Sequence, residues 1–263
     1  NINELTIENI FESVKYVQSI AKGAYSVLTI ISDFGMLAFT DNNGIRPLLL
    51  GKKEFNSKIS YCFSSESSSL DLLNYNVIKN MKGSEIVFID KNFNIHSTVS
   101  EKGKQHFCIF EYIYFSRADS IIFNKSVAAE RIKMGKLLAN QIKEKNLKID
   151  VIVDVPKSGY FAAVGLSEEL NIPHKRALIP NDYIGRSFIL PKQSQRESVI
   201  KQKFSIIKDV VENKNVALVD DSIVRGTTAK YIVKQLKNYG AKNVYLISAA
   251  PPLKFPLFYN IFI

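Results

Sequence analysis

The chain has 263 residues, 46% hydrophobic and 23% charged, which is enough for one large domain or two modest ones with buried cores. Its two cysteines form no CxxC pair and its three histidines lie far apart, so we expect no disulfide framework, no zinc site and a reduced, cytoplasmic setting. The net charge of +10 comes from scattered lysines, which favours a solvated surface over nucleic-acid binding and would also attract a polyanionic small substrate. The longest apolar runs are strand-sized, so no membrane span is expected.

Up to about residue 100 the pattern predicts one helix followed by an antiparallel sheet. Apolar residues recur at helical spacing from Thr6 to Ala21, and Gly23 provides a stop. Short apolar runs then follow one another, separated by turn-forming clusters such as residues 41–44. The expected strands are Val27–Ile31, Gly35–Thr40, Arg46–Leu50, Ile59–Phe63, Ile86–Asp90 and Phe93–Thr98.

After Lys104 predicted strands alternate with predicted helices. The expected helices are Val127–Lys143, Tyr160–Leu170 and Thr228–Tyr239. The expected strands are Asp150–Val155, Lys175–Ile179, Val216–Asp220 and Val244–Ala249, with a long polar loop before Val216. This alternation predicts an α/β domain with a parallel, doubly wound sheet. The change of rhythm predicts two domains, residues 1–103 and 104–263.

The segment Val216–Thr228 combines acidic and phosphate-binding features. An apolar strand ends in Asp220 and Asp221, and a short turn leads to a helix that begins near Thr227. In doubly wound sheets ligands bind beyond the carboxyl ends of strands, and a helix start with a glycine beside it suits a phosphate. Two carboxylates fit a ribose, because they can accept hydrogen bonds from its hydroxyls. The same hydroxyls can also hold Mg²⁺. The alternative is helix capping, which needs one Asp and not two.

Val216–Thr228 (VALVDDSIVRGTT) resembles the phosphoribosylpyrophosphate (PRPP) motif of type I phosphoribosyltransferases. Two further stretches, Cys108–Ser120 (CIFEYIYFSRADS) and Asn181–Pro191 (NDYIGRSFILP), resemble glutamine PRPP amidotransferases. Three others resemble the latter part of that family's glutaminase domain: Gly23–Ser26, Gly35–Gly51 and Ser64–Leu73. The resemblance implies the C-terminal half of an N-terminal-nucleophile glutaminase, an antiparallel sheet with helices, followed by a type I phosphoribosyltransferase.

The resemblance also implies an activity. The family hydrolyses glutamine at an N-terminal cysteine and uses the ammonia to displace pyrophosphate from PRPP, which gives 5-phosphoribosylamine in purine biosynthesis. We therefore expect an amidophosphoribosyltransferase, a pentosyl-transferring glycosyltransferase, with Mg²⁺ as cofactor. Expected partners are PRPP, glutamine or ammonia, purine nucleotides as inhibitors and further copies of the chain in a homo-oligomer, without nucleic acid or a membrane.

Matching positions assign roles within the expected site. Asp220 and Asp221 would hold the ribose hydroxyls and Mg²⁺, and Ser158 would contact Mg²⁺ and pyrophosphate. The remaining expected PRPP contacts are Lys157, Gly159, Ser222, Val224, Arg225, Gly226, Thr227 and Thr228. The loop Asn181–Lys203 would close over PRPP, with Arg186 and Tyr183 as its catalytic residues. A guanidinium suits phosphate oxygens that gain charge, although an exposed surface arginine is the alternative for Arg186.

The chain departs from the family at both ends. Because its first helix corresponds to a point inside the glutaminase domain, we expect the nucleophilic cysteine and the glutamine-binding residues upstream of Asn1. Neither Cys62 nor Cys108 is expected to replace that nucleophile. The family continues past Ala249–Pro252, whereas Leu253–Ile263 is a short apolar tail, so we expect a fragment or an interrupted reading frame.

Substitutions also fall inside the expected site. Lys157 stands where an acid is usual, and Asp182 reverses a charge in the loop. Cys108 matches one ligand of the iron–sulfur cluster of some members but Leu257 replaces another, so no cluster is expected. Two alternatives to an enzyme therefore remain: a PRPP-binding regulator, although no helix-turn-helix precedes the domain, and an inactive truncated product.

Overall fold

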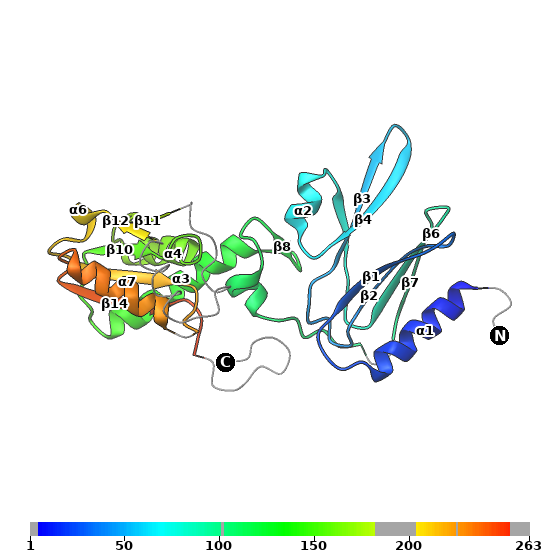
Figure 1. Ribbon diagram of the computed structural model, residues 1–263, viewed down its shortest axis with the longest axis horizontal. Coiled ribbons are helices and arrows are strands. Elements are labelled where there is room, and N and C mark those ends of the chain that lie inside the picture. Colours follow the sequence, from blue (N-terminus) through cyan, green and yellow to red (C-terminus); the bar gives the residue numbers. More distant parts are fainter. Residues whose placement is uncertain (1–4, 101–102, 182–203, 225, 253–263) are drawn as a thin grey trace. The chain divides into compact units, whose positions relative to one another are not determined.

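The computed structural model describes residues 5–100, 103–181, 204–224 and 226–252 (Figure 1). These residues pack as two units. The first contains the described residues up to Glu111 together with Ser116–Val127, and the second contains Tyr112–Phe115 and the described residues from Ala128 onward. The domain boundary at residues 103 and 104 stays a prediction, because packing units and family domains need not end at the same residue.

The first unit begins with the predicted helix. Helix α1 (Ile7–Ile20) starts after Thr6, whose Oγ1 accepts a hydrogen bond from Asn9 N at 3.2 Å. The Asn9 side chain accepts one from Thr6 N at 3.1 Å, so the two residues form a capping box. A four-stranded antiparallel sheet follows in the order β1-β2-β6-β7. Its strands are β1 (Ser26–Ile31), β2 (Gly35–Thr40), β6 (Glu85–Asp90) and β7 (Ile95–Val99).

A second antiparallel sheet of the first unit has the order β4-β3-β5. Its strands are β3 (Leu49–Phe55), β4 (Lys58–Ser64) and β5 (Asn76–Asn80). The strand predicted at Arg46–Leu50 has the wrong bounds, since β3 begins only at Leu49. Pro47 has no N–H to give to a ladder, which explains why pairing starts after it. The short helix α2 (Ser67–Leu72) and strand β5 were not predicted.

Alternating side chains give the four-stranded sheet two apolar faces. Leu37 and Phe39 of β2 belong to one buried cluster with Val14 of α1. Ala38 of β2 belongs to another, with Leu50 of the second sheet. Because side chains of a strand alternate in direction, the first unit is layered as helix, sheet and sheet (Figure 1).

The second unit contains the predicted parallel sheet, in the order β10-β13-β14. Its strands are β10 (Val151–Asp154), β13 (Asn215–Asp220) and β14 (Asn243–Ser248), and its longer helices are α3 (Val127–Glu144), α4 (Tyr160–Leu170) and α7 (Thr227–Asn238). Ile232 of α7 packs in one cluster with Val153. On the other face, Ala163 of α4 packs in a cluster with Ile152. Helices therefore cover both faces, as a doubly wound sheet requires.

The edge of this sheet departs from the prediction. The strand expected at Lys175–Ile179 does not join the parallel sheet, where only His174 bridges Ile152, and only its last two residues are in a strand. The chain then leaves that edge, and β11 (Leu178–Pro180) pairs antiparallel with β12 (Phe204–Ile206). Helix α6 (Lys208–Val211) also lies where a loop was expected. The remaining short elements are the π-helix η1 (Glu111–Phe115) and strands β8 (Ile121–Ile122) and β9 (Lys125–Ser126).

Candidate functional site

Two loops meet at the carboxyl edge of the parallel sheet. Residues 155–159 follow β10, and residues 221–226 follow β13. The strands are direct neighbours, with Asp154 paired to Val219, and Val155 N donates to Val219 O at 2.8 Å. In open α/β sheets this edge is where ligands bind, so the geometry brings two of the predicted segments to one place.

A hydrogen bond joins the two loops directly. Ser158 Oγ donates to Asp220 Oδ1 at 2.8 Å, and Asp221 N donates to the same oxygen at 2.9 Å. Ser158 and Asp220 were both predicted as site residues, and they lie 62 positions apart in the sequence. The bond fixes the Asp220 carboxylate relative to the loop after β10.

The loop after β10 has a conformation that few sequences accept. Lys157 has a φ of 74°, in the left-handed region that residues with a side chain adopt at a cost of about 1–3 kcal/mol. A Cβ on Gly159 would lie 2.1 Å from Val219 O, so glycine is required for the close approach to β13. Strained residues that persist in a fold concentrate at functional sites.

Asp221 is the most perturbed acid of the site. Its side chain is buried, with 6% exposure, and its Oδ1 accepts a hydrogen bond from Ser222 Oγ at 2.7 Å. Among the described residues, no hydrogen-bond partner reaches its Oδ2. Burial raises the pKa of Asp221 to about 6, the Ser222 hydrogen bond opposes this, and the charge of Asp220 adds to it. A buried carboxylate oxygen without a partner is costly, so a hydroxyl or a cation would satisfy it.

The start of α7 offers a place for an anion. Gly226 is the N-cap residue, with a φ of 68°. It has no side chain, and no described side chain forms a capping hydrogen bond at this helix start. An added Cβ on Gly226 would meet nothing closer than Ile223 Cγ2 at 3.9 Å, so the space is open. The first turn holds Thr227 and Thr228 and no acidic residue. Backbone N–H groups and the helix dipole therefore favour a phosphate here.

These loops contain most of the predicted site residues. Seven of the predicted positions lie in them: Lys157, Ser158, Gly159, Asp221, Ser222, Val224 and Gly226. Three more adjoin them, since Asp220 ends β13 and Thr227 and Thr228 begin α7. Arg225, Arg186 and Tyr183 lie outside the described residues, as do Asp182, Leu257 and the rest of residues 182–203 and 253–263. The roles of all of them stay predictions.

Sequence reasoning missed a buried cation beside the acids. Arg131 of α3 has 9% exposure, its Nε donates to Tyr112 O at 2.7 Å, and its charge lowers the pKa of Asp221. A signal for it existed, because Arg131 falls on the apolar stripe of α3 with Met134, Leu138 and Ile142. An arginine on such a stripe has to find a partner inside the protein.

The donor set constrains any metal. In the described part of the chain, no group of three or more His, Cys, Asp or Glu side chains could share an ion. Mg²⁺ usually keeps several waters and binds one or two carboxylates together with substrate phosphates. Asp220, Asp221 and Ser158 fit that mode of binding. The two cysteines, Cys62 and Cys108, are not in a disulfide.

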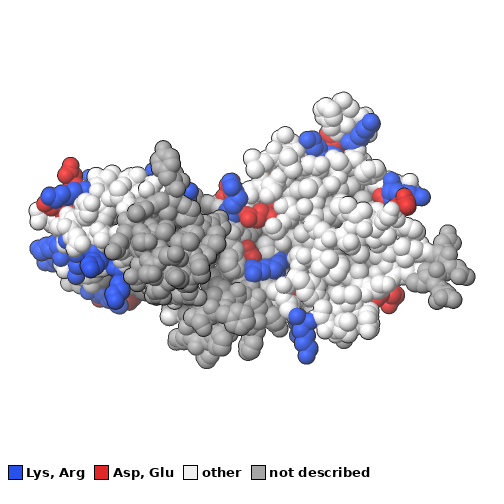
Figure 2. Space-filling view, viewed as in Figure 1, with Lys and Arg blue, Asp and Glu red and all other residues white. Residues whose placement is uncertain are grey.

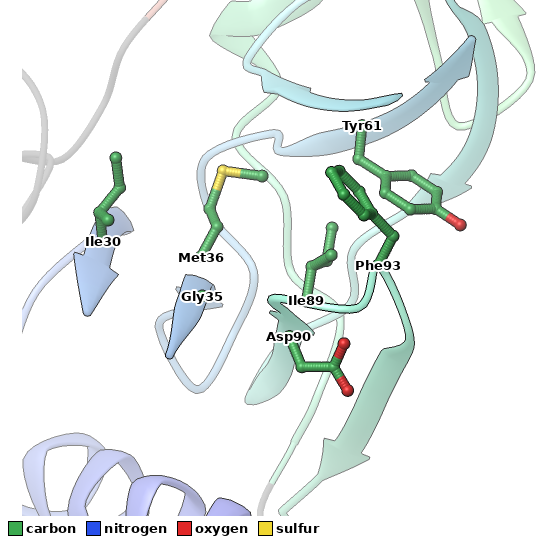
Figure 3. Close-up of a pocket in the computed structure, with 7 residues that line it drawn as sticks. All are labelled: Ile30, Gly35, Met36, Tyr61, Ile89, Asp90 and Phe93. Atoms are coloured by element: carbon green, nitrogen blue, oxygen red, sulfur yellow. The ribbon is translucent and has the colours of Figure 1, made fainter. Parts of the chain in front are cut away.

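A hollow of about 230 Å³ in the first unit is a different kind of place (Figure 3). Its lining is mainly apolar: Ile30, Gly35, Met36, Tyr61, Ile89, Asp90 and Phe93. In Figure 3 the Asp90 carboxylate points away from the Tyr61 ring. Asp90 already accepts hydrogen bonds from Asn92 N at 2.8 Å and Asn94 N at 2.9 Å. This hollow therefore lacks the unsatisfied polar group that the sheet edge has.

Comparisons with known proteins agree with the site at the sheet edge. Residues 125–251 match the phosphoribosyl transferase domain family. The amidophosphoribosyltransferase of Haemophilus influenzae is 39% identical over 98% of this chain, and that of Escherichia coli is 36% identical over 98%. The chain is similar to amidophosphoribosyltransferases along nearly its whole length. It spans about half the length of the curated relatives it matches, 52% in both cases.

The fold agrees with that family. The glutamine PRPP amidotransferase of B. subtilis, solved with ADP and GMP, superposes with a TM-score of 0.83 and 36% identity over 98% of this chain and 55% of that one. The predicted fold class, an antiparallel glutaminase part followed by a type I phosphoribosyltransferase, is thereby confirmed.

One face of the described residues shows how the charged side chains are distributed. On the face drawn in Figure 2, Lys and Arg side chains of the described residues stand in several places with acidic side chains among them. In the part of the chain that the structure describes, no helix has the length and apolar character needed to cross a bilayer.

Proposed function

We propose that the chain carries the PRPP-binding half of a cytoplasmic amidophosphoribosyltransferase of purine biosynthesis. It would make 5-phosphoribosylamine and pyrophosphate from PRPP and ammonia, with glutamine as the source of ammonia in the whole enzyme. The observation that carries the proposal is the Asp220–Asp221 pair, joined to Ser158 and placed beside the start of α7. The similarity over 98% of the chain supports it.

The site offers one surface for each part of PRPP. The N–H groups at the start of α7 would bind the 5-phosphate, with Thr227 and Thr228 as further donors. The carboxylates of Asp220 and Asp221 would accept hydrogen bonds from the ribose hydroxyls. The loop of residues 155–159, joined to Asp220 through Ser158, would then contact pyrophosphate.

The proposed reaction is a displacement at C1 of the ribose. The lone pair of ammonia forms the new C1–N bond, the C1–O bond breaks with its electrons leaving on pyrophosphate, and the new amine loses a proton. Lys157 is exposed in the loop that would face the leaving group, where its ammonium would offset developing negative charge. Arg186 and Tyr183 are proposed to act from the loop that closes over PRPP and excludes water.

Mg²⁺ is the proposed cofactor, held by Asp220, Asp221 and Ser158, and when bound it would neutralise charge on the pyrophosphate. The orphaned Oδ2 of Asp221 supports this assignment, since a cation or a hydroxyl would give that oxygen a partner. Because an acceptor-only carboxylate is needed for either ligand, we expect binding of Mg²⁺ and ribose to weaken as the pH falls below about 6.

Further partners are proposed from the relatives. The B. subtilis enzyme was solved with ADP and GMP, and we propose that purine nucleotides inhibit the present enzyme too. We also propose a homo-oligomer that binds neither nucleic acid nor a membrane. We propose that it carries no iron–sulfur cluster, because Leu257 stands where some family members have a cysteine ligand.

The decisive experiment compares Asp221→Asn with the wild-type chain in the presence of PRPP, Mg²⁺ and ammonia, and measures pyrophosphate and 5-phosphoribosylamine. We expect a loss of at least about 100-fold in the variant, as is typical when a charged group at the reacting centre is removed. Asp209→Asn, an exposed acid on α6, is the matched control and should keep full activity. Unchanged pyrophosphate release in Asp221→Asn would show that the site assignment is wrong.

Calorimetry separates the enzyme from the two alternatives. A folded wild-type chain that binds Mg²⁺-PRPP is the expected result, with weak turnover at most by this chain alone. Heat of binding without turnover would favour a PRPP-binding regulator, and no heat from a folded sample would favour an inactive product.

A further inference from the structure

His174 contacts both ends of the loop that follows β10. Asp154 is the last residue of β10, and Tyr160 is the first residue of α4, so these two residues bracket the loop of residues 155–159. His174 Nε2 lies 2.9 Å from Asp154 Oδ1. The His174 and Tyr160 rings lie with their centroids 5.5 Å apart and their planes tilted by 58°. One side chain thus connects the two points where the loop enters and leaves regular structure.

The backbone around His174 is itself held to the sheet. Ile152 N donates to Pro173 O at 3.0 Å, and Lys175 N donates to Ile152 O at 2.9 Å. These two bonds form the single parallel bridge at the outer edge of β10. His174 therefore lies at a fixed backbone position, as a positioning residue requires, and not on a long loop.

The Asp154–His174 contact is well protected from water. The Asp154 side chain is 5% exposed and that of His174 is 16% exposed. A carboxylate accepts hydrogen bonds, so Nε2 carries the hydrogen in this contact whether the ring is neutral or charged. Removing the donor would leave a buried carboxylate without this partner, which is far more costly than losing an exposed bond.

The loop needs such anchors because its conformation is strained. Lys157 has a φ of 74°, and such a conformation persists only when the surroundings over-determine it. From β13 the loop is held by Val155 N to Val219 O at 2.8 Å and by Ser158 Oγ to Asp220 Oδ1 at 2.8 Å. Both of these anchors lie on the β13 side. His174 supplies the anchor on the opposite side, at the outer edge of β10.

We propose that His174 is a positioning residue that pre-organises residues 155–159 for pyrophosphate, by holding Asp154 with a hydrogen bond and Tyr160 through ring contact. The identity of the ligand rests on the proposed function. His174 itself does not touch the ligand in this proposal, since it acts through the two residues that bracket the loop. Asp221 and the start of α7 are anchored on β13, and only Asp220 shares a hydrogen bond with the loop, through Ser158.

This division predicts selective loss of one ligand. His174→Phe keeps a ring beside Tyr160 and removes the donor to Asp154. By calorimetry with Mg²⁺, we expect about tenfold weaker binding of pyrophosphate, since a small misplacement of a binding group costs at least that much. Binding of ribose 5-phosphate should weaken by no more than about twofold, since only the Ser158–Asp220 hydrogen bond couples the loop to the carboxylates. His174→Gln can still donate to Asp154 and should recover most of the pyrophosphate affinity.

The controls keep the two proposals apart. His106→Phe changes an exposed histidine of the first unit and should leave both ligands unaffected. If wild-type chain binds neither ligand, the proposed function fails and this inference fails with it. If wild-type chain binds both and His174→Phe changes neither, or weakens both equally, the inference about His174 alone is overturned.

A second variant covers the case in which His174→Phe does not fold. Tyr160→Ala removes the ring contact and leaves the Asp154–His174 hydrogen bond in place, at a residue with 39% exposure. We expect about threefold weaker pyrophosphate binding, in line with the energy of an aromatic pair, with ribose 5-phosphate unchanged. Unaltered pyrophosphate binding in Tyr160→Ala would overturn the proposal.

Discussion

Two aspartates near the ends of buried strands differ in what their carboxylates do. Asp90 ends β6 in the first unit, and Asp221 follows β13 in the second. Asp90 accepts bonds from two backbone N–H groups of its turn, from the Asn94 amide at 3.1 Å and from His96 Nε2 at 2.9 Å. Asp221 accepts one from Ser222, and its second oxygen is buried without a described partner.

The pKa values of the two acids move in opposite directions for that reason. The hydrogen bond from His96, with those from Asn94 and Asn92, holds the pKa of Asp90 well below its ordinary range. Burial instead raises the pKa of Asp221 to about 6. An acid at a strand end is therefore not itself evidence of a site. The evidence is an acid whose bonding capacity the fold leaves unused.

The largest expected effect on stability comes from Asp221→Asn. The folded pKa of about 6 exceeds the ordinary value of 3.8, so the folded state binds the proton more tightly and loses stability as the pH rises from about 4 to 6. The difference between these two pKa values corresponds to a destabilisation of the folded state by about 3 kcal/mol, which is fully present above pH 6. The neutral amide avoids it.

Urea unfolding with EDTA present, at pH 4 and pH 7.5, measures this effect. Asp221→Asn should be more stable than wild type at pH 7.5, and the two proteins should converge at pH 4. A variant that is less stable at pH 7.5 would mean that the fold already satisfies this carboxylate, and the contrast with Asp90 would disappear.

The next effect tests how tightly the two loops of the site are joined. Gly159→Ala places a Cβ 2.1 Å from Val219 O, a backbone atom that cannot move away without disturbing β13. We expect the free energy of unfolding to fall by about 1–3 kcal/mol, the usual cost of overpacking a buried position, which urea unfolding measures. Pyrophosphate binding should weaken as well, because the loop has to shift away from Asp220.

Gly23→Ala is the comparison variant, because an added Cβ at Gly23 has nothing within 4 Å. Gly23 has a φ of 139°, so Gly23→Ala reports backbone strain alone. A Gly159→Ala chain as stable as wild type, with unchanged pyrophosphate affinity, would show that the approach to β13 is not needed.

Local patterns predicted the parts of the site that are contiguous in sequence. Helix α4 was predicted with its observed bounds and α7 within one residue at each end. For α7 the reason is that apolar spacing specifies an amphipathic helix. Asp220 and Asp221 were recognised because two acids directly follow an apolar strand. Strands β11 and β12 have three residues each and exist through pairing with each other, which a local pattern does not contain.

Contacts between distant residues account for what the sequence did not reveal. The Asp154–His174 pair joins positions 20 apart, and Ser158 meets Asp220 across 62 positions. Ser158 was assigned by resemblance, and its bond to Asp220 emerged only from the pairing of β10 with β13. The orphaned oxygen of Asp221 likewise depends on burial by several elements, so no spacing rule could predict it.

The smallest expected effect is that of Asp90→Asn, and it tests the other side of the comparison. A depressed folded pKa contributes stability above the ordinary pKa of 3.8, and this is lost as the pH falls below that value. Asp90→Asn should therefore lower the melting temperature slightly at pH 7, with a smaller difference in acid. Because these bonds serve only the turn before β7, PRPP and pyrophosphate binding should not change. If Asp90→Asn instead raised the stability and weakened PRPP binding, the two acids would be alike, and unused bonding capacity would no longer distinguish the site.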